Sequence, residues 1–155
     1  MWLPPEEENK ASNLWQKEFA KDDRVIAFNI GASWMTKRWI DAYFAECADR
    51  FIEEGYHIAF LGGPTDVAIV KACIEKMKEK DSSKVHVFTG KVSLTVLAGL
   101  LRRCCLFLTT DSGPMHVGVA MNVPIVTMFG ASPVPTFYPY DSKDIVIKTP
   151  ESCHP

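Results

Sequence analysis

The chain has 155 residues, 47% hydrophobic and 23% charged, which is the size and composition of one globular domain with a sizeable core. The 17 Lys and Arg residues against 19 Asp and Glu residues give a net charge of -2, so no bulk positive field would hold a nucleic acid. No apolar run approaches the roughly 20 residues of a membrane-spanning helix, and the N-terminus does not resemble a signal peptide. These features exclude two full domains and a nucleic-acid partner, and they indicate a cytoplasmic protein without a transmembrane segment.

Residues 1–23 form a charge-rich lead-in to the rest of the chain. Leu14, Trp15 and Phe19 recur at near-helical spacing within residues 5–22, which predicts an amphipathic helix. Its apolar stripe has to pack on the domain that follows.

From residue 24 onwards, short apolar runs alternate with helical patterns. The predicted strands are residues 25–28, 57–61, 85–88, 106–109, 124–128 and 145–147. The predicted helices after the lead-in are residues 43–55, 66–78, 93–103 and 114–121. Strands that are apolar on both faces and alternate with helices predict a parallel sheet with helices on both sides. Residues 24–150 are therefore expected to form an α/β, Rossmann-like three-layer domain, with residues 151–155 as a tail.

Two loops carry most of the polar chemistry. In a sheet of order 3-2-1-4-5, a crevice opens between strands one and four, so the loops after these strands face each other. The first loop, residues 31–39, offers a flexible backbone, two hydroxyls and two cations. In the second loop, Pro114 suits the first helical position and Asp111 or Ser112 suits the cap. The free N–H groups of such a helix start attract phosphate, and Lys37 from the opposite loop can add a positive charge.

Each of these features also has a structural interpretation. The segment Asp111 to Pro114 is equally explained as a helix cap, and His116 can face either a ligand or the core. Ser112 and His116 are four residues apart, the spacing of a nucleophile and its base on a helix, but a G-x-S-x-G elbow is absent. Arg38 is most simply a solvated or ion-paired neighbour of Lys37.

The remaining motifs narrow the ligand class. Asp66 follows the second strand, where an acidic residue can bind ribose hydroxyls, although Asp66 or Thr65 can equally cap the next helix. Neither G-x-G-x-x-G after the first strand nor a G-x-x-x-x-G-K-[ST] loop occurs, which disfavours nicotinamide cofactors and P-loop chemistry. The five cysteines lack a C-x-x-C pair, so buried thiols in a reducing compartment are expected and a metal site at Cys153 and His154 is not.

Several motifs together resemble a known family. In chain order they are Gly31 with Lys37-Arg38-Trp39, Leu61-Gly62-Gly63-Pro64 with Asp66, Gly90-Lys91-Val92-Ser93-Leu94, Asp111-Ser112-Gly113-Pro114-Met115-His116, and Pro124 through Gly130. This order resembles the carboxyl-terminal domain of the ADP-heptose:lipopolysaccharide heptosyltransferase family, glycosyltransferase family 9, over roughly residues 24–140.

The resemblance implies the C-terminal, donor-binding half of a GT-B glycosyltransferase, in which two Rossmann-like domains enclose the active site. By this resemblance, Lys37 contacts and stabilises the leaving diphosphate, and Ser33 contacts the phosphate or nearby sugar. Asp111, Ser112 and Gly113 would contact the phosphates and the donor sugar at the helix start.

The same resemblance places three further residues and the partners. His116 would lie at the same end of the pocket, Asp66 near the ribose, and Val92 in the loop at the nucleobase edge. The implied donor is a sugar nucleotide, an ADP-sugar, without a metal or other cofactor. The implied acceptor is a lipid-linked saccharide of the lipopolysaccharide core. Another domain would bind this acceptor and carry the catalytic base. The enzyme would lie at the periphery of the inner membrane. The alternative is a non-catalytic nucleotide-binding or interaction module.

Overall fold

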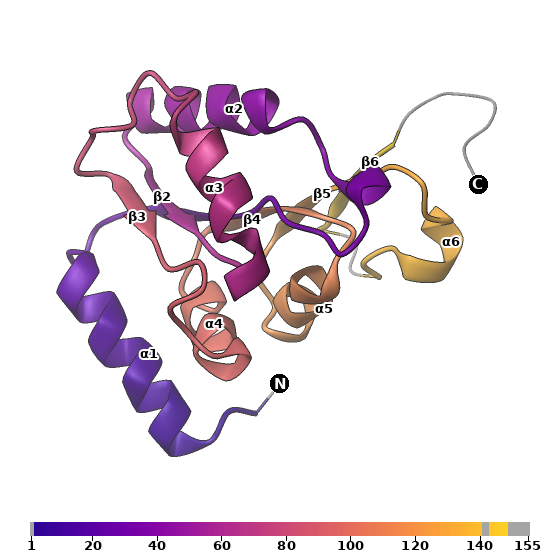
Figure 1. Ribbon diagram of the computed structural model, residues 1–155. Helices are drawn as coiled ribbons and strands as arrows, with labels where there is room; N and C mark the ends of the chain where they lie inside the picture. Colours follow the sequence, from indigo (N-terminus) through magenta and orange to yellow (C-terminus); the bar gives the residue numbers. More distant parts are fainter. Residues whose placement is uncertain (1, 141–142, 149–155) are drawn as a thin grey trace.

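A six-stranded parallel sheet of order β3-β2-β1-β4-β5-β6 forms the centre of the protein (Figure 1), as seen in a computed structural model that describes residues 2–140 and 143–148. The strands are β1 (Val25–Asn29), β2 (His57–Phe60), β3 (Val85–Val87), β4 (Leu106–Thr110), β5 (Ile125–Phe129) and β6 (Ile145–Lys148). The predicted parallel sheet and its order are confirmed, with β6 added beside β5 at the edge. The predicted tail, residues 151–155, lies outside the described residues.

Helices cover both faces of the sheet, which confirms the three-layer α/β architecture. They are α1 (Pro5–Glu18), α2 (Asp41–Glu53), α3 (Val67–Ile74), α4 (Leu94–Leu101), α5 (Gly113–Ala120) and α6 (Val134–Phe137), with 3-10 helices η1 (Met35–Lys37) and η2 (Pro64–Asp66). Helices α2 and α3 lie on one face, and α1, α4 and α5 lie on the other (Figure 1). Among the described helices, none is both long and apolar enough to cross a membrane.

The sheet is buried on both sides because its strands are apolar at consecutive positions. In β1, Ile26 and Phe28 belong to the core under α2 and α3, whereas Val25 and Ala27 belong to the core under α1 and α4. This alternation follows from the two-residue period of a strand. A continuous apolar run therefore serves two cores, one on each face.

Helix α1 packs tightly on α4 and closes the second core. A Cβ atom on Gly99 would lie 2.5 Å from the Cβ of Ala11, so only glycine permits this approach of the two helices. At the edge of the contact, Glu8 forms an ion pair with Arg103 at 2.6 Å. Phe19, directly after α1, is buried against the sheet. The predicted amphipathic helix is confirmed, and it ends at Glu18.

The third helix is shorter than its sequence pattern indicates. The pattern predicts a helix over residues 66–78, but α3 ends at Ile74. The cause is Asp49, a buried carboxylate on α2, which accepts hydrogen bonds from the backbone N–H groups of Lys78 and Glu79, each at 3.0 Å. These bonds fix residues beyond α3 in turns against α2. The short elements η1, η2 and α6 were not predicted either.

We predict that Asp49→Ala lowers the free energy of unfolding by about 2–3 kcal/mol, because two backbone N–H groups lose a charged acceptor. Urea denaturation followed by circular dichroism measures this change. Asp81→Ala is the matched control, since Asp81 is exposed in the same segment, and it is expected to leave the unfolding midpoint in place. Equal stability of the two variants would contradict this role of Asp49.

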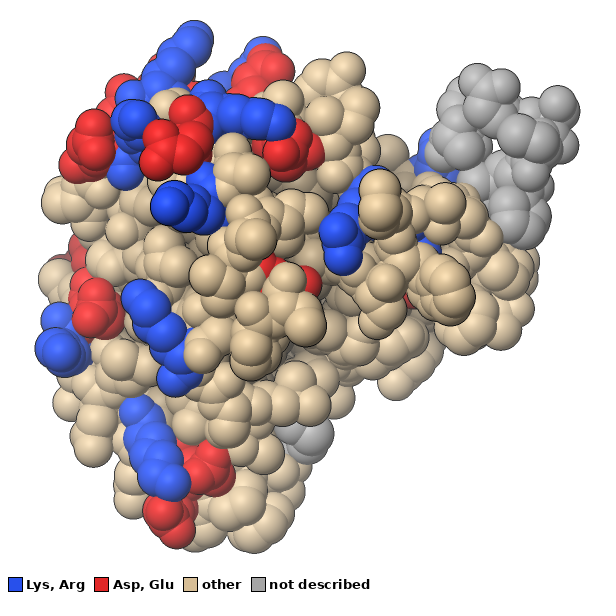
Figure 2. All heavy atoms as spheres, viewed as in Figure 1, with Lys and Arg blue, Asp and Glu red and all other residues tan. Residues whose placement is uncertain are grey.

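Charged side chains of both signs are interspersed on the face of the molecule shown in Figure 2. Over α1 and α2, Lys and Arg side chains lie beside Asp and Glu side chains, and no basic stripe runs across this face. Ion pairs such as Lys10 with Glu6 and Arg50 with Glu46 account for part of this mixing.

Candidate functional site

The carboxyl ends of β1 and β4 bring the two polar loops together. These strands pair directly, with Asn29 opposite Thr109, so the residues that follow each strand emerge side by side. A cavity of about 370 Å³ lies between them. It is lined by Asn29, Gly31, Ala32, Ser33, Arg38, Thr65, Asp66, Ser112, Gly113 and Pro114. Four of the residues selected from the sequence therefore share one cavity: Ser33, Asp66, Ser112 and Gly113.

The start of α5 presents backbone donors to this cavity. Ser112 is the N-cap residue, and the N–H of Met115 bonds to the Ser112 carbonyl at 3.1 Å, while Pro114 has no N–H. In the part of the chain that the structure describes, the N–H groups of Ser112 and Gly113 bond to no acceptor. Free N–H groups and the positive end of the helix dipole form an anion site. Fewer N–H groups are free at this site than the sequence indicates, because the N–H of Met115 bonds within the helix.

Ser112 occupies the cap position as predicted, but its side chain makes no cap hydrogen bond to α5. The Ser112 hydroxyl donates to the carbonyl of Thr110 at 3.2 Å and accepts from the amide of Asn29 at 2.9 Å, so it bonds outside the helix. Pro114 occupies the second helical position rather than the first. The side chain of Asp111 also makes no cap, because it faces a lysine of the opposite loop.

Lys37 and Asp111 form an ion pair that joins the two loops. The Lys37 Nζ lies 2.8 Å from Asp111 Oδ2, and the Asp111 residue is only 3% exposed. The same Nζ lies 5.4 Å from the centre of the Phe137 ring on α6. A carboxylate and an aromatic face together hold a lysine ammonium in place. Lys37 is thus positioned beside the start of α5 by its ion pair with Asp111 and lies near the Phe137 ring.

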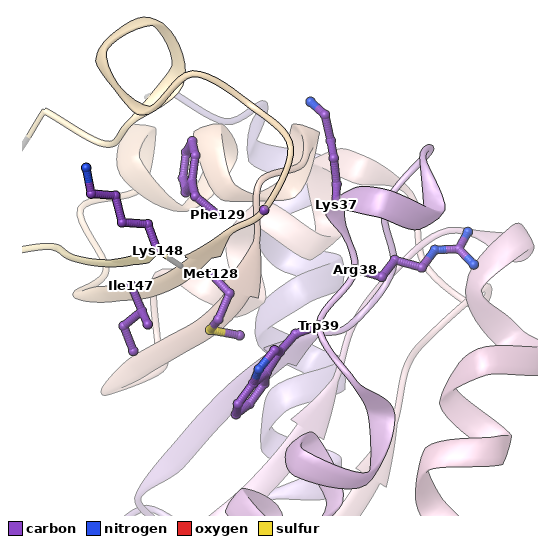
Figure 3. A pocket seen from close by; sticks show the side chains of 8 residues that line it. Lys37, Arg38, Trp39, Met128, Phe129, Ile147 and Lys148 are labelled. Atoms are coloured by element: carbon purple, nitrogen blue, oxygen red, sulfur yellow. The ribbon is translucent and has the colours of Figure 1, made fainter. Parts of the chain in front are cut away.

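A second hollow, of about 310 Å³, lies on the other side of the Lys37 segment. In Figure 3, the segment carrying Lys37 and Trp39 faces Met128 of β5 and Lys148 of β6 across this hollow. Lys37 and Arg38 point in different directions (Figure 3). A Cβ on Gly130 would lie 2.6 Å from the carbonyl oxygen of Thr36, so glycine is required where the loop after β5 meets η1.

Two residues on the cavity wall were not selected from the sequence. The Arg38 Nε donates to the carbonyl of Ala32 at 2.9 Å, and Arg38 is half-buried on the cavity wall. Of the two interpretations, solvated or ion-paired, the ion pair is not found within the described residues. The signal available in the sequence was a second cation beside Lys37. Asn29 is a buried amide at the end of an otherwise apolar strand, a position where a polar side chain is unexpected.

The Asp66 side chain does not cap α3, the role that the sequence left open, but bonds at the start of η2 instead. Its Oδ2 accepts from the N–H of Gly63 at 2.9 Å at the start of η2. Its carboxylate also lies against Gly31, where a Cβ atom would come within 2.1 Å of Asp66 Oδ1. Gly31 is therefore required to admit this carboxylate. Asp66 also lines the cavity, and its contact with a ribose stays a prediction.

Val92 and His116 lie away from the cavity wall. Val92 is half-buried beside Glu7 and Lys10 of α1, and His116 is exposed on α5. In the described part of the chain the Ser112 hydroxyl bonds to Asn29 and Thr110 and not to His116, so the geometry gives a hydrolase no nucleophile and base. The ligand contacts of Val92 and His116 stay predictions. Across residues 2–140 and 143–148, no group of three His, Cys, Asp or Glu side chains is arranged to hold a metal ion.

Comparison with known proteins agrees with this fold. The sequence matches glycosyltransferase family 9 (heptosyltransferase) over residues 5–155. The chain therefore belongs to this family.

Individual relatives give the same result. The chain is 29% identical over 138 residues to lipopolysaccharide heptosyltransferase 2 of Escherichia coli strain K12, covering 88% of this chain and 39% of that protein. A glycosyltransferase family 9 structure from Veillonella parvula is 40% identical with a TM-score of 0.88, over 98% of this chain and 43% of that one. The structure of E. coli ADP-heptose lps heptosyltransferase II has a TM-score of 0.83 at 27% identity, over 95% of this chain and 44% of that one. The chain thus spans about two fifths of the length of these relatives, and the match to glycosyltransferases of the GT-B class covers one part of them.

We predict that Lys37→Ala destabilises the protein by about 1–3 kcal/mol, because buried Asp111 loses its cation. Adding Asp111→Asn to the same chain removes the unpaired charge, so the double variant is expected to regain most of the loss. Urea unfolding of the parent, both single variants and the double variant gives the coupling energy. Additive losses, with no recovery in the double variant, would show that the pair is not coupled.

Proposed function

We propose that this chain is the donor-binding half of a heptosyltransferase. It would bind a sugar nucleotide, ADP-heptose, and serve an enzyme that transfers heptose to the lipopolysaccharide core. One observation carries the proposal: the free N–H groups of Ser112 and Gly113 and the side chain of Arg38 line one cavity, with Lys37 fixed beside it. This is a concentration of anion-binding groups, and a diphosphate is the anionic part of a sugar nucleotide.

The proposed chemistry follows from where charge develops. Glycosyl transfer breaks the bond between the anomeric carbon and a phosphate oxygen, so positive charge builds on the sugar and negative charge on the departing diphosphate. Backbone N–H groups and cations that are fixed before the reaction stabilise that anion without reorganisation. Lys37 and the start of α5 fit this task, and we propose that these groups act without a metal ion.

The activities of the relatives support the finer assignment. One relative of known structure is an E. coli ADP-heptose lps heptosyltransferase, and another is an E. coli lipopolysaccharide heptosyltransferase. We propose that a further domain of the longer enzyme binds the lipid-linked saccharide acceptor and carries the base that deprotonates its hydroxyl. Residues 1–155 alone are then expected to bind donor without transferring sugar.

We propose a cytoplasmic site of action, and the free cysteines support a reducing compartment. Cys47, Cys73, Cys104 and Cys105 are all free thiols. Burial raises the pKa of the Cys73 thiol to about 12 and that of Cys104 further still, so both stay protonated and unreactive at neutral pH.

We predict that ADP binds residues 1–155 with one-to-one stoichiometry in isothermal titration calorimetry, more tightly than adenosine, because the cavity contributes its donors to the diphosphate. Inorganic phosphate is expected to compete weakly with ADP. A folded protein that shows no heat with ADP would overturn the proposed function.

We further predict that Lys37→Ala weakens ADP binding by about 1.5–3 kcal/mol, the contribution of a charge-assisted contact. Lys148→Ala is the matched control, because Lys148 lines the second hollow together with Lys37 but, unlike Lys37, forms no ion pair with Asp111 at the start of α5 among the described residues. Combining Lys37→Ala with Asp111→Asn separates the lost contact from repulsion by the unpaired carboxylate. Equal weakening by Lys148→Ala and Lys37→Ala would place the diphosphate in the second hollow, which both lysines line.

A further inference from the structure

A buried amide joins the two loops of the cavity. Asn29 is 1% exposed, and its Nδ2 lies 3.2 Å from the carbonyl oxygen of Gly31, 3.3 Å from Thr109 Oγ1 and 2.9 Å from Ser112 Oγ. The two amide hydrogens thus meet acceptors from the loop after β1 and from the segment around the end of β4. The Asn29 Oδ1 is buried and accepts no hydrogen bond from any described residue.

None of these acceptors depends on Asn29 for its only hydrogen bond. The Thr110 hydroxyl donates to the Gly31 carbonyl at 2.7 Å. The hydroxyls of Thr109 and Ser112 both donate to the Thr110 carbonyl, at 3.1 Å and 3.2 Å. Removing the Asn29 amide would therefore leave none of its acceptors without a bond, whereas keeping it leaves Oδ1 buried without a partner, which is unfavourable. The requirement to satisfy buried polar groups does not account for an asparagine here.

The position of this network provides another explanation. Strand pairing between β1 and β4 ends at Asn29 and Thr109. Beyond that point, no backbone hydrogen bond joins residues 31–33 to residues 111–113 in the described structure. The side chains of Asn29 and Thr110 bridge the two loops where the backbone ladder stops. Both side chains donate to the Gly31 carbonyl, and the Asn29 amide also donates to the hydroxyl of Ser112, a residue that lines the cavity.

We propose that Asn29 and Thr110 are positioning residues of the diphosphate site. They fix the separation of the two loops, so that the N–H groups of Ser112 and Gly113 are aimed at the ligand before it binds. This inference rests on the proposed function, because the diphosphate is the group that these N–H donors would hold. Preorganised donors bind an anion more tightly than donors that must be ordered on binding.

The test compares binding with stability in four variants. Asn29→Ala and Thr110→Val each remove one side of the bridge, and Thr110→Ser keeps the hydroxyl. Thr127→Val is the matched control, since Thr127 on β5 is a buried threonine whose Oγ1 has no partner among the described residues. Calorimetry gives the dissociation constants for ADP and adenosine, and urea unfolding gives the midpoint for each variant.

We expect Asn29→Ala and Thr110→Val to weaken ADP binding about tenfold or more, the loss of one positioned hydrogen bond or more, while adenosine binding stays at the parent value. Thr110→Ser is expected to restore ADP binding relative to Thr110→Val, and Thr127→Val to leave it unchanged. Because the acceptors of Asn29 keep other bonds, the unfolding midpoint of Asn29→Ala is expected to stay near that of the parent.

Two results would overturn the inference. One is parental ADP affinity in folded Asn29→Ala and Thr110→Val. The other is an equal loss of ADP and adenosine affinity together with a lowered unfolding midpoint, which would show a purely structural role. If Asn29→Ala fails to fold, the comparison of Thr110→Val with Thr110→Ser decides alone. If the folded parent binds neither ADP nor adenosine, the proposed function itself is contradicted. If the parent binds ADP, the variants test the role of Asn29 and Thr110 separately from the proposed function.

Discussion

The parallel pairing of β1 with β4 is the constraint on which the candidate site depends. It places the ends of two strands that are distant in the sequence side by side, with Asn29 opposite Thr109. The two loops that meet at the cavity follow from this pairing, because each loop begins where its strand ends, and the loop after β2 adds Thr65 and Asp66. In sheets of this order the crevice at the reversal of strand order is a binding site for physical reasons: two helices lead away from it on opposite faces.

The ion pair between Lys37 and Asp111 adds chemistry to this geometry. A buried carboxylate with one cationic partner contributes little net stability, since both charges lose hydration. Its effect is to fix where the ammonium stands, between Asp111 and the ring of Phe137. Together with the N–H groups at the start of α5, this gives a set of donors that exists before any ligand arrives.

Much of the fold follows from the sequence because its signals are local. Apolar runs and turn residues locate the strands, and the strand order follows from general rules of α/β topology. The end of α3 does not follow from local signals, because the turns after it are bonded to Asp49, which is far away in the sequence. At the site, local signals identified Ser33, Ser112 and Gly113 as neighbours. The contacts of Asn29 and Arg38 could not be predicted from the sequence, because they depend on how the loops pack against one another.

Nuclear magnetic resonance of the 15N-labelled chain during titration with ADP tests most directly whether the start of α5 holds the diphosphate. We predict that the backbone amide signals of Ser112 and Gly113 shift most strongly and together, as the diphosphate accepts their hydrogen bonds. The same spectra report whether the amides of Val92 and His116 respond. Shifts concentrated at Ile147 and Lys148, with Ser112 and Gly113 unchanged, would contradict the claim that the start of α5 holds the diphosphate.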